Sequence, residues 1–268
     1  TMAVEAGRDC LTGIDRNIVA GIYMASTSFP FQDRQNAGIV ADALNLSTRI
    51  QTLDISSSQR AGSSALLAAL LSVHSAEGPI LVSASEKRRA RAASPLELTT
   101  GDGAAAVLVG EGEPIAHYIG GHTEAVDFVD HYRGEGEAFD YNWEERWVRD
   151  EGYMKIAPNA INNLLDKVGV SAQDIDTFCF PVAMRRVASS LARKIGIAEE
   201  SVADNLQSSC GETGSAHALV LLVHALEQAK PGEKMALTRF YLDTEWDGED
   251  MLLQSRAMDE TGYVQPTK

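Results

Sequence analysis

The chain has 268 residues, of which 44% are apolar and 23% are charged. These values are close to those of ordinary globular domains, and they exclude a disordered, collagenous or coiled-coil chain. The 38 acidic side chains outnumber the 23 basic ones, so the net charge is −15. A chain this acidic is a poor partner for nucleic acid or for an anionic membrane surface.

Cysteine usage and hydropathy indicate a cytoplasmic protein. Cys10, Cys179 and Cys210 are odd in number and widely spaced, which is typical of reduced thiols rather than of a disulfide framework. No apolar run is long enough to span a membrane, and the first residues lack the pattern of a signal peptide. The sequence has no CxxC or HExxH motif, so we predict no metal site.

The N-terminal part of the chain alternates helix and strand. In chain order, its hydrophobic pattern predicts a helix at 2–12, a strand at 17–26, a helix at 33–44, a strand at 49–55, a helix at 62–74, and strands at 79–84 and 104–109. The helix at 62–74 is apolar on nearly every side, so we expect it to lie inside the domain. This order of elements is typical of a layered α/β fold.

Residues 111–152 interrupt this pattern and are rich in acidic, glycine and aromatic residues, so we interpret them as an insertion or a long connection. The regular pattern then returns, with helices predicted at 157–168, 184–195 and 215–229, a turn at 171–174, and strands at 177–181, 234–241 and 251–255. The turns before two buried strands, at 13–18 and 169–176, are similar. We therefore expect two duplicated α/β halves, at 1–115 and 153–268, joined by residues 116–152.

Four segments of the chain resemble motifs of the thiolase superfamily. They are Asp54–Leu66, which is similar to the nucleophile segment D-x-x-x-A-C-x-G-x-x-x-A-L, the sequence GDGAAAVLV at 101–109, residues 178–185 with the helix that follows, and Cys210–Ser215. Their order and spacing agree with the ketoacyl synthase III and HMG-CoA synthase branch. The resemblance implies an αβαβα layered fold and a dimer. It also implies that the first βα unit of the family precedes Thr1.

The chemistry of this family, as the resemblance implies it, uses a cysteine thiolate at the start of a buried helix to take an acyl group from a thioester. A histidine and an asparagine then stabilise the enolate or the oxyanion. In this chain the cysteine position is Gln59, the histidine position is Val182 and the asparagine position is Glu212. The family's glycine-rich segment near the C-terminus is replaced by residues 240–246, in which the glycines are absent.

Two residues are candidates for a substitute nucleophile. Ser58, with its neighbours Ser56 and Ser57, lies at the nucleophile segment, although no histidine occupies the family's base position to activate it. Its simpler interpretation is a polar turn between a strand and a helix. Cys210 lies beside the asparagine position, and its simpler interpretation is a small buried apolar side chain.

Other polar and aromatic groups have two interpretations each. Arg88, Arg89 and Arg91 form the basic run of this acidic chain, and either bind the phosphates of coenzyme A or an acidic partner, or form a solvated loop. The acidic and histidine residues at 122–131 fit no familiar set of metal ligands, so we interpret them as a solvated surface. Trp143 and Trp147 share a face of a helical turn, and cover a pocket, contact a partner or simply pack.

Two functions are consistent with these residues. The loss of all three catalytic groups favours a non-catalytic thiolase-like subunit, which pairs with an active thiolase-like or HMG-CoA-synthase-like subunit and with a small zinc-ribbon/OB-fold protein. The alternative is an acyl-CoA-dependent acyltransferase or condensing enzyme with an altered site. In both cases we expect no covalently bound cofactor, with a coenzyme A thioester as the candidate substrate. The sequence names neither the acyl group nor the partner.

Overall fold

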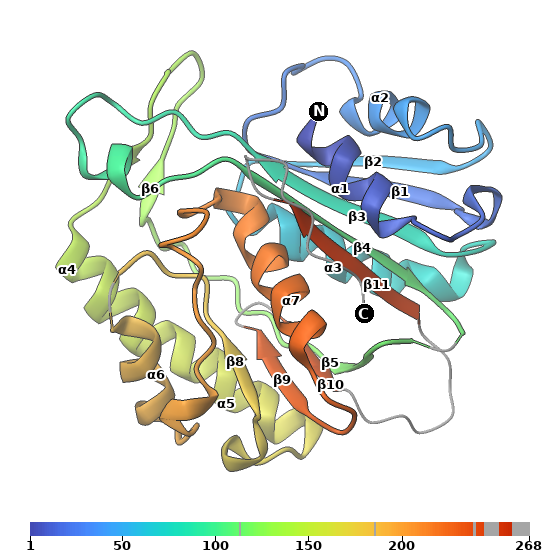
Figure 1. Ribbon diagram of the computed structural model, residues 1–268. Helices are drawn as coiled ribbons and strands as arrows, with labels where there is room; N and C mark the ends of the chain where they lie inside the picture. Colours follow the sequence, from blue (N-terminus) through green and yellow to red (C-terminus); the bar gives the residue numbers. More distant parts are fainter. Residues whose placement is uncertain (113, 185, 238–239, 244–251, 259–268) are drawn as a thin grey trace.

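The computed structural model describes residues 1–112, 114–184, 186–237, 240–243 and 252–258. Its helices and two main sheets form alternating layers in the order helix, sheet, helix, sheet, helix (Figure 1). This arrangement confirms the αβαβα fold that the sequence predicts.

The first sheet has the strand order β11-β4-β3-β1-β2. Its strands are β1 (Gly21–Ala25), β2 (Gln51–Ile55), β3 (Ile80–Glu86), β4 (Gly103–Gly110) and β11 (Leu252–Met258). Strands β1, β2 and β3 are parallel, whereas β4 is antiparallel to β3 and β11 is antiparallel to β4. All residues of β1 and β4 are buried, as expected for a sheet with helices on both faces.

The second sheet has the strand order β5-β10-β9-β8. Its strands are β5 (His117–Gly120), β8 (Thr177–Cys179), β9 (Lys234–Leu237) and β10 (Phe240–Asp243). The strand predicted at 234–241 is instead the two antiparallel strands β9 and β10, in which Leu237 pairs with Phe240. Residues 238–239 between them lie outside the described residues, as do 244–246 of the segment that replaces the family's glycines.

Each of the two sheets includes a strand from a part of the chain that we did not expect in it. Strand β5 lies in the segment 116–152 that we expected to be a connection, yet it pairs with β10 of the second sheet. Strand β11 comes from the C-terminal half, yet it pairs along its length with β4 of the first sheet. The rest of the segment contains the short hairpin of β6 (His131–Tyr132) and β7 (Tyr141–Asn142).

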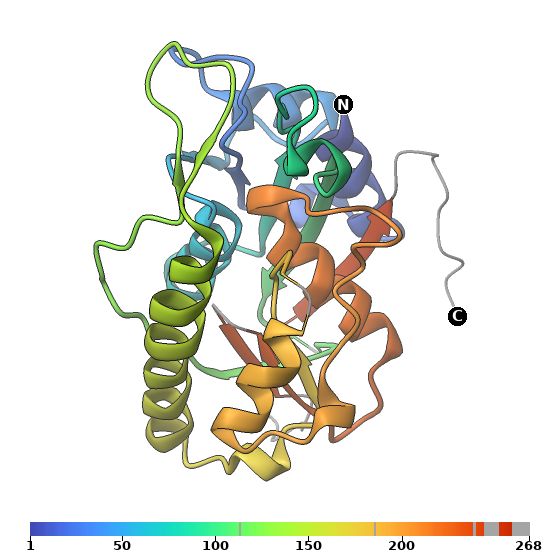
Figure 2. The same ribbon diagram turned by 90° about the vertical axis from the view of Figure 1, so that its left-hand side faces the viewer.

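The longer helices of the described residues form three helical layers (Figures 1 and 2). They are α1 (Met2–Cys10) and α2 (Asn36–Ala43) on one side, α3 (Ala61–Ser72) and α7 (His217–Gln228) between the sheets, and α5 (Ala157–Val168) and α6 (Val187–Ile195) on the other side. The short α4 (Glu145–Trp147) continues through the π-helix η4 (Val148–Ile156) into α5. Short 3₁₀ helices are η1 (Arg16–Ile18), η2 (Val73–Ser75), η3 (Pro95–Leu98), η5 (Ala172–Asp174), η6 (Glu199–Ser201) and η7 (Gly214–Ala216).

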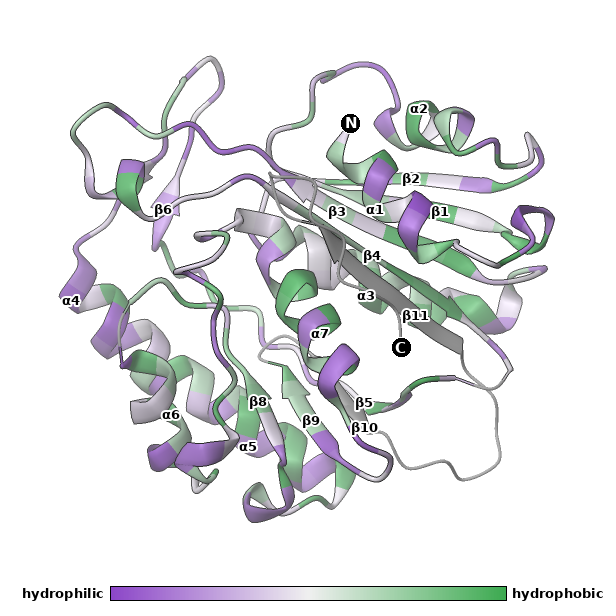
Figure 3. Cartoon of the chain, viewed as in Figure 1, coloured by the Kyte–Doolittle hydropathy of each residue, from purple (hydrophilic) through white to green (hydrophobic). Residues whose placement is uncertain are grey.

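Alternating side chains along the strands divide the apolar core of the described residues into a central cluster between the two sheets and an outer cluster on the far side of each sheet. On β4, Ala105, Val107 and Val109 join the cluster around α3 and α7, whereas Ala106 and Leu108 join the cluster around α1 and α2. Strand β8 divides in the same way, with Cys179 in the central cluster and Phe178 in the outer cluster. The apolar residues of the strands appear green in Figure 3, with the helices on both sides.

Helix ends follow the glycines that the sequence marks. Gly169 and Gly196 end α5 and α6 in the left-handed conformation, with φ of 69° and 89°, which glycine adopts without strain. Helix α6 begins at Val187, later than the predicted start at 184, because Arg186 has a φ of 64° and interrupts the helical backbone. Among the described residues, no helix combines the length and apolarity that crossing a membrane requires.

Gly62 allows the central helix α3 to approach η7. A Cβ atom on Gly62 would lie 2.2 Å from the carbonyl oxygen of Ser215, so the Gly62→Ala variant forces two backbone segments apart. We expect this change to lower the free energy of unfolding by about 1–3 kcal/mol, the usual cost of overpacking. Urea denaturation of the purified protein measures it.

Gly38 in α2 is the matched control, since a Cβ there meets only the side chain of Gln35 at 3.5 Å. Gly38→Ala should raise the free energy of unfolding by about 0.4–1 kcal/mol, because it restricts the unfolded chain. Equal effects of the two substitutions would contradict the close approach of α3 and η7.

Candidate functional site

The candidate site lies where the carboxyl ends of the parallel strands meet the first turns of α3 and η7. Thr27 follows β1, Gln59 lies between β2 and α3, and Glu86 ends β3. In open α/β sheets this edge is the usual place for a ligand. A Cβ on Gly214 would lie 2.6 Å from Cγ of Glu86 and 3.1 Å from Oε1 of Gln59, so segments far apart in the sequence converge here.

Gln59 occupies the turn that leads into α3, the position that the sequence assigns to the family nucleophile. Two residues earlier, Ser57 has a φ of 68°, a left-handed conformation that is uncommon for a residue with a side chain. Ser56, Ser57 and Ser58 are exposed, and Oγ of Ser58 accepts a hydrogen bond from the Arg60 amide at 3.1 Å. The turn therefore presents hydroxyl and amide groups, and no thiol, at the head of the helix.

A cavity of about 1000 Å³ opens at this turn. Ser56 to Arg60 form one wall, and the opposite wall comes from residues 124–137 and from the π-helix, including Tyr153 and Ile156. The volume is at the upper end of the range that holds small-molecule ligands. A space for a substrate of substantial size therefore leads to Gln59.

Glu86 joins three segments behind the turn. Glu86 is only 1% exposed. Its Oε2 accepts hydrogen bonds from the Thr27 amide at 2.8 Å, the Thr27 hydroxyl at 2.9 Å and the Ser215 hydroxyl at 2.6 Å. These donors compensate the cost of burying the carboxyl group. Sequence analysis missed Glu86, although its place at the end of a buried strand was a possible signal.

Glu212, which the motif match assigns to the family's asparagine position, forms an ion pair with Arg88. Arg88 also binds Asp140, with 2.8 Å between Nη2 and Oδ2, and Asp140 binds Arg133 at 3.1 Å. The side chains of Arg88 and Asp140 are only 7% and 4% exposed. Burial by itself lowers the pKa of Arg88, but the two carboxylates outweigh it and the pKa is raised.

This network changes the interpretation of the basic run. Two carboxylates inside the protein compensate the charge of Arg88, so Arg88 is not available to bind a phosphate group. Arg89 and Arg91 remain available. Glu212 is an acceptor held by a guanidinium and by the Gly214 amide at 2.9 Å, whereas stabilising an enolate requires a donor.

Val182, which the motif match assigns to the family's histidine position, is buried in the apolar cluster of α5 and α6. It is 2% exposed and does not line the cavity described above. Its backbone carbonyl accepts a hydrogen bond from Nδ2 of Asn205 at 3.0 Å. The side chain at this position therefore contributes packing and offers no hydrogen bond to a substrate.

Cys210 lies beside the site but outside the cavity. Its thiol contacts the carbonyl oxygens of Leu206 and Gly211 at 3.4 Å each. The glycine of the GDG motif allows this loop to pass, because a Cβ on Gly101 would lie 1.8 Å from the Cys210 carbonyl oxygen. Burial raises the pKa of Cys10 and of Cys179 to about 12, so both remain neutral thiols at neutral pH.

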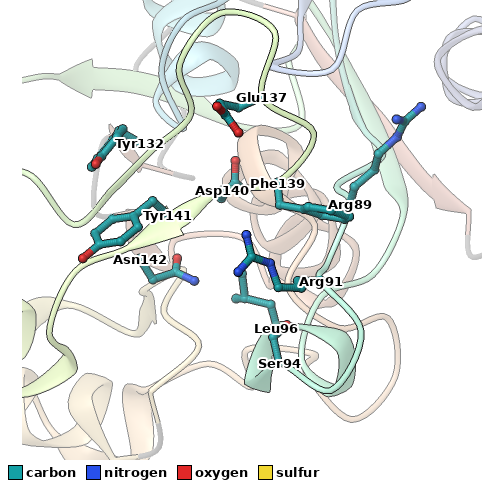
Figure 4. A pocket seen from close by; sticks show the side chains of 10 residues that line it. All are labelled: Arg89, Arg91, Ser94, Leu96, Tyr132, Glu137, Phe139, Asp140, Tyr141 and Asn142. Carbon is teal, nitrogen blue, oxygen red and sulfur yellow. The ribbon is translucent and has the colours of Figure 1, made fainter.

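A smaller cavity of about 460 Å³ lies between the basic run and the β6–β7 hairpin. Figure 4 shows Arg91 directing its guanidinium into this space near Phe139, whose ring centroid lies 5.9 Å from Cζ of Arg91. Arg89 lines the same cavity but directs its guanidinium away from its centre (Figure 4). Of the three arginines that the sequence singled out, two therefore line a cavity and one is buried.

His131 and Asp130 form a further polar pair in the wall of the larger cavity. Nδ1 of His131 lies 2.9 Å from Oδ1 of Asp130. Burial by itself raises the pKa of Asp130, but the hydrogen bonds and charge of His131 outweigh it and the pKa is lowered. The pair lies in the segment that sequence analysis interpreted as a solvated surface. No trio of His, Cys, Asp or Glu among the described residues is placed to hold a metal ion.

Similar sequences agree with this arrangement. Residues 165–246 match the family model described as 3-oxoacyl-[acyl-carrier-protein] synthase III C terminal. The hydroxymethylglutaryl-CoA synthase of Methanosphaera stadtmanae is 31% identical over 241 residues, which cover 88% of this chain and 69% of that protein. The hydroxymethylglutaryl-CoA synthase of Thermococcus gammatolerans is 26% identical and covers 99% of this chain and 77% of its own length.

Solved structures share the fold. The 3-oxoacyl-[acyl-carrier-protein] synthase III of Aquifex aeolicus superposes with a TM-score of 0.77 at 20% identity, covering 95% of this chain and 84% of its own. An HMG-CoA synthase complexed with CoA has a TM-score of 0.68 at 17% identity, covering 94% and 70%. These structures agree with the layered architecture, and the sequence relatives identify the branch. The chain belongs to the hydroxymethylglutaryl-CoA synthase family of the thiolase superfamily.

Proposed function

We propose that this chain is a non-catalytic subunit that supports an active acyl-CoA-processing partner of the thiolase or HMG-CoA synthase type. The observation that carries the proposal is Gln59 at the head of α3. A glutamine amide forms no thioester with an acyl group, and Gln59 faces the cavity where a nucleophile is required. Relatives of this chain are named as synthases of hydroxymethylglutaryl-CoA, so the partner handles an acyl-CoA.

The surroundings of Gln59 support the same proposal. Val182, an apolar side chain buried in the core, occupies the position that we assign to the family's histidine. The position that holds an asparagine is a carboxylate, Glu212, paired with Arg88. A single substitution that restored one of these three catalytic groups would leave the other two absent. This argues against an active site that differs from the family's at one residue only.

The cavities give the subunit a way to act on the acyl substrate of its partner. The larger cavity has the volume for a thioester arm, and Arg91 and Arg89 line the smaller one beside Phe139. Guanidinium groups bind phosphates through paired hydrogen bonds. We therefore propose that a coenzyme A thioester binds here without a covalent bond to this chain. A homodimer or a heteromer with the active subunit, joined by a zinc-ribbon/OB-fold protein, completes the proposed assembly.

One observation favours the alternative, an acyltransferase with an altered site. Ser57 and Ser58 line the same cavity as His131. Nδ1 of His131 lies 2.9 Å from Oδ1 of Asp130. A serine, a histidine and an aspartate are the groups of a common acyl-transfer site. In this alternative the serine replaces the cysteine as the acyl acceptor.

Intact-mass spectrometry after incubation with acetyl-CoA or malonyl-CoA tests the proposal. We expect no covalent adduct on the natural chain, together with co-purification of this chain with an intact thiolase-like subunit that does become acylated. The Gln59→Cys variant, made with Cys210→Ser to remove the partly exposed thiol, should gain an acyl group because the start of α3 stabilises a thiolate.

An adduct on the natural chain would contradict the non-catalytic role. Ser57→Ala, Ser58→Ala and His131→Asn variants would then show whether the serine–histidine alternative is correct. A Gln59→Cys protein that stays unmodified would contradict the assignment of Gln59 to the head of an accessible cavity.

Replacing Arg88 tests the ion-pair network at the former asparagine position. Arg88→Met leaves two buried carboxylates with weaker compensation, so we expect the free energy of unfolding to fall by about 3–5 kcal/mol. Thermal and urea denaturation measure the change. Adding Glu212→Gln should recover much of the loss, because Asp140 keeps Arg133 as its ion-pair partner and no carboxylate is then left unpaired.

Arg193 provides the control for this experiment. Its ion pair with Glu199 is 70% and 64% exposed, so Arg193→Met should change the stability by at most about 1 kcal/mol. A loss for Arg88→Met as small as that for Arg193→Met would show that the buried network is not stabilising the site.

A further inference from the structure

The segment that follows β5 carries a continuous row of aromatic side chains. We call Phe128, Tyr132, Tyr141, Trp143 and Trp147 the aromatic face. Neighbouring ring centroids lie 5.1 Å apart for Tyr132 and Tyr141, 6.3 Å for Tyr141 and Trp143, 6.2 Å for Trp143 and Trp147, and 4.4 Å for Trp147 and Phe128. The rings therefore contact one another in sequence and form a single surface feature.

Most of this row is exposed to solvent. Tyr132, Tyr141, Trp143 and Trp147 are 52%, 56%, 46% and 38% exposed, and Val126 beside them is 52% exposed. Scattered apolar side chains on a surface need no explanation, but a contiguous group of this size is typical of an interaction site. Tyrosine and tryptophan are also the side chains that contribute most to the centres of protein interfaces.

The aromatic face is held in place by the body of the protein. Arg133 binds Asp140 and the carbonyl oxygen of Thr27, which fixes the hairpin to the end of β1. The Trp143 amide donates to the Asp130 carbonyl at 2.8 Å, and the Glu144 side chain accepts from the Arg146 and Trp147 amides at 2.9 and 2.7 Å. A surface organised before binding loses little conformational entropy when a partner arrives.

The charge around the aromatic face specifies the partner. Residues 124–151 contain ten acidic and three arginine side chains, a net charge of −7 out of the −15 of the chain. Asp140 and Glu151 are paired with Arg88 and Lys155 from outside this range, and counting these two cations leaves a net charge of −5. A second copy of the same acidic chain would bring like charge to the contact, whereas a basic surface is complementary to it.

Arginine is the basic side chain that matches both features of this surface. Its guanidinium stacks on the faces of tryptophan and tyrosine, and it binds carboxylates through two parallel hydrogen bonds. Lysine provides the charge without the planar contact. We propose that the aromatic face binds an arginine-bearing, basic surface of a partner protein.

The position of the aromatic face connects this contact to the cavities. Tyr132, Glu137 and Asp140 line both the larger and the smaller cavity, so a protein bound to the aromatic face lies at the wall shared by both. The biological role of this contact rests on the proposed supporting function. The contact itself does not, because it requires no catalysis by either chain.

Isothermal titration calorimetry with two defined peptides tests this surface. The probes are an arginine–glycine repeat and a lysine–glycine repeat of equal length and charge. We expect the natural chain to bind the arginine peptide about tenfold more tightly, as one or two cation–π contacts provide. Trp143→Ala combined with Trp147→Ala should abolish this preference and leave the binding of the lysine peptide unchanged.

Charge is tested separately with matched variants. Asp127→Asn with Glu145→Gln removes two charges near the aromatic face, and Glu77→Gln with Glu200→Gln removes two exposed charges on other elements. The first pair should weaken both peptides severalfold more than the second. Leu98→Ala, at a residue that is 90% exposed, is the control for loss of an unrelated apolar side chain.

Three results would overturn the inference. Equal affinity of the natural chain for the two peptides would reduce the contact to general charge. An unchanged arginine preference in the double tryptophan variant would place the arginine contact away from the aromatic face. A homodimer that the tryptophan substitutions dissociate in analytical ultracentrifugation would assign the surface to a second copy.

Two controls test whether the variants still fold. Circular dichroism measures their secondary structure, and a Trp143→Phe/Trp147→Phe variant, which retains aromatic rings, should show an intermediate preference for the arginine peptide. An acyl adduct on the natural chain with the peptide preference intact would contradict the proposed function alone.

Discussion

The fold depends on one shared layer, in which α3 and α7 are buried between two sheets. Helix α3 can occupy that layer because its sequence is small and apolar on nearly every side, and because Gly62 lets it approach the carbonyl oxygen of Ser215. This constraint also builds the candidate site. The first turns of α3 and η7 must start next to each other, at the edge where β1, β2 and β3 end, so Gln59, Glu86 and Gly214 converge although they are far apart in the chain.

The polar groups at that convergence are arranged to compensate one another. Glu86 receives its hydrogen bonds from Thr27 and Ser215, and Glu212 and Asp140 share Arg88. Pairing and hydrogen bonding offset the large cost of taking buried charges out of water, and groups paired in this way have little capacity left for a substrate. Catalytic sites usually hold groups with unmet demands, such as donors aimed at a developing negative charge. The network around Glu212 therefore has the character of a structural element, while the cavity beside it stays open.

The segment between β5 and α5 contributes both to a cavity wall and to an exposed aromatic surface. Phe128, His131 and Arg133 line the larger cavity, and Tyr132 lines both cavities, while Trp143 and Trp147 are partly exposed to solvent. Arg133 connects the segment to Thr27 and to Asp140, so the aromatic face and the cavity wall are fixed by the same contacts. A protein bound to the aromatic face and a ligand bound in the cavity would therefore contact the same short hairpin.

The sequence by itself determined the layered fold and the order of most helices and strands, because hydrophobic periodicity and motif spacing are local properties of the chain. The absence of the family's catalytic residues stays a prediction from the motif match. The sequence also located Gln59 and the glycines that end α5 and α6. Only the tertiary structure decided which sheet β5 and β11 join, that residues 234–241 divide into two strands, and that Arg88 is buried in an ion pair whereas Arg91 lines a cavity. These outcomes depend on pairing and burial between residues distant in the chain, such as Arg88 with Asp140 and Glu212, and a side chain's identity does not reveal which partners will surround it.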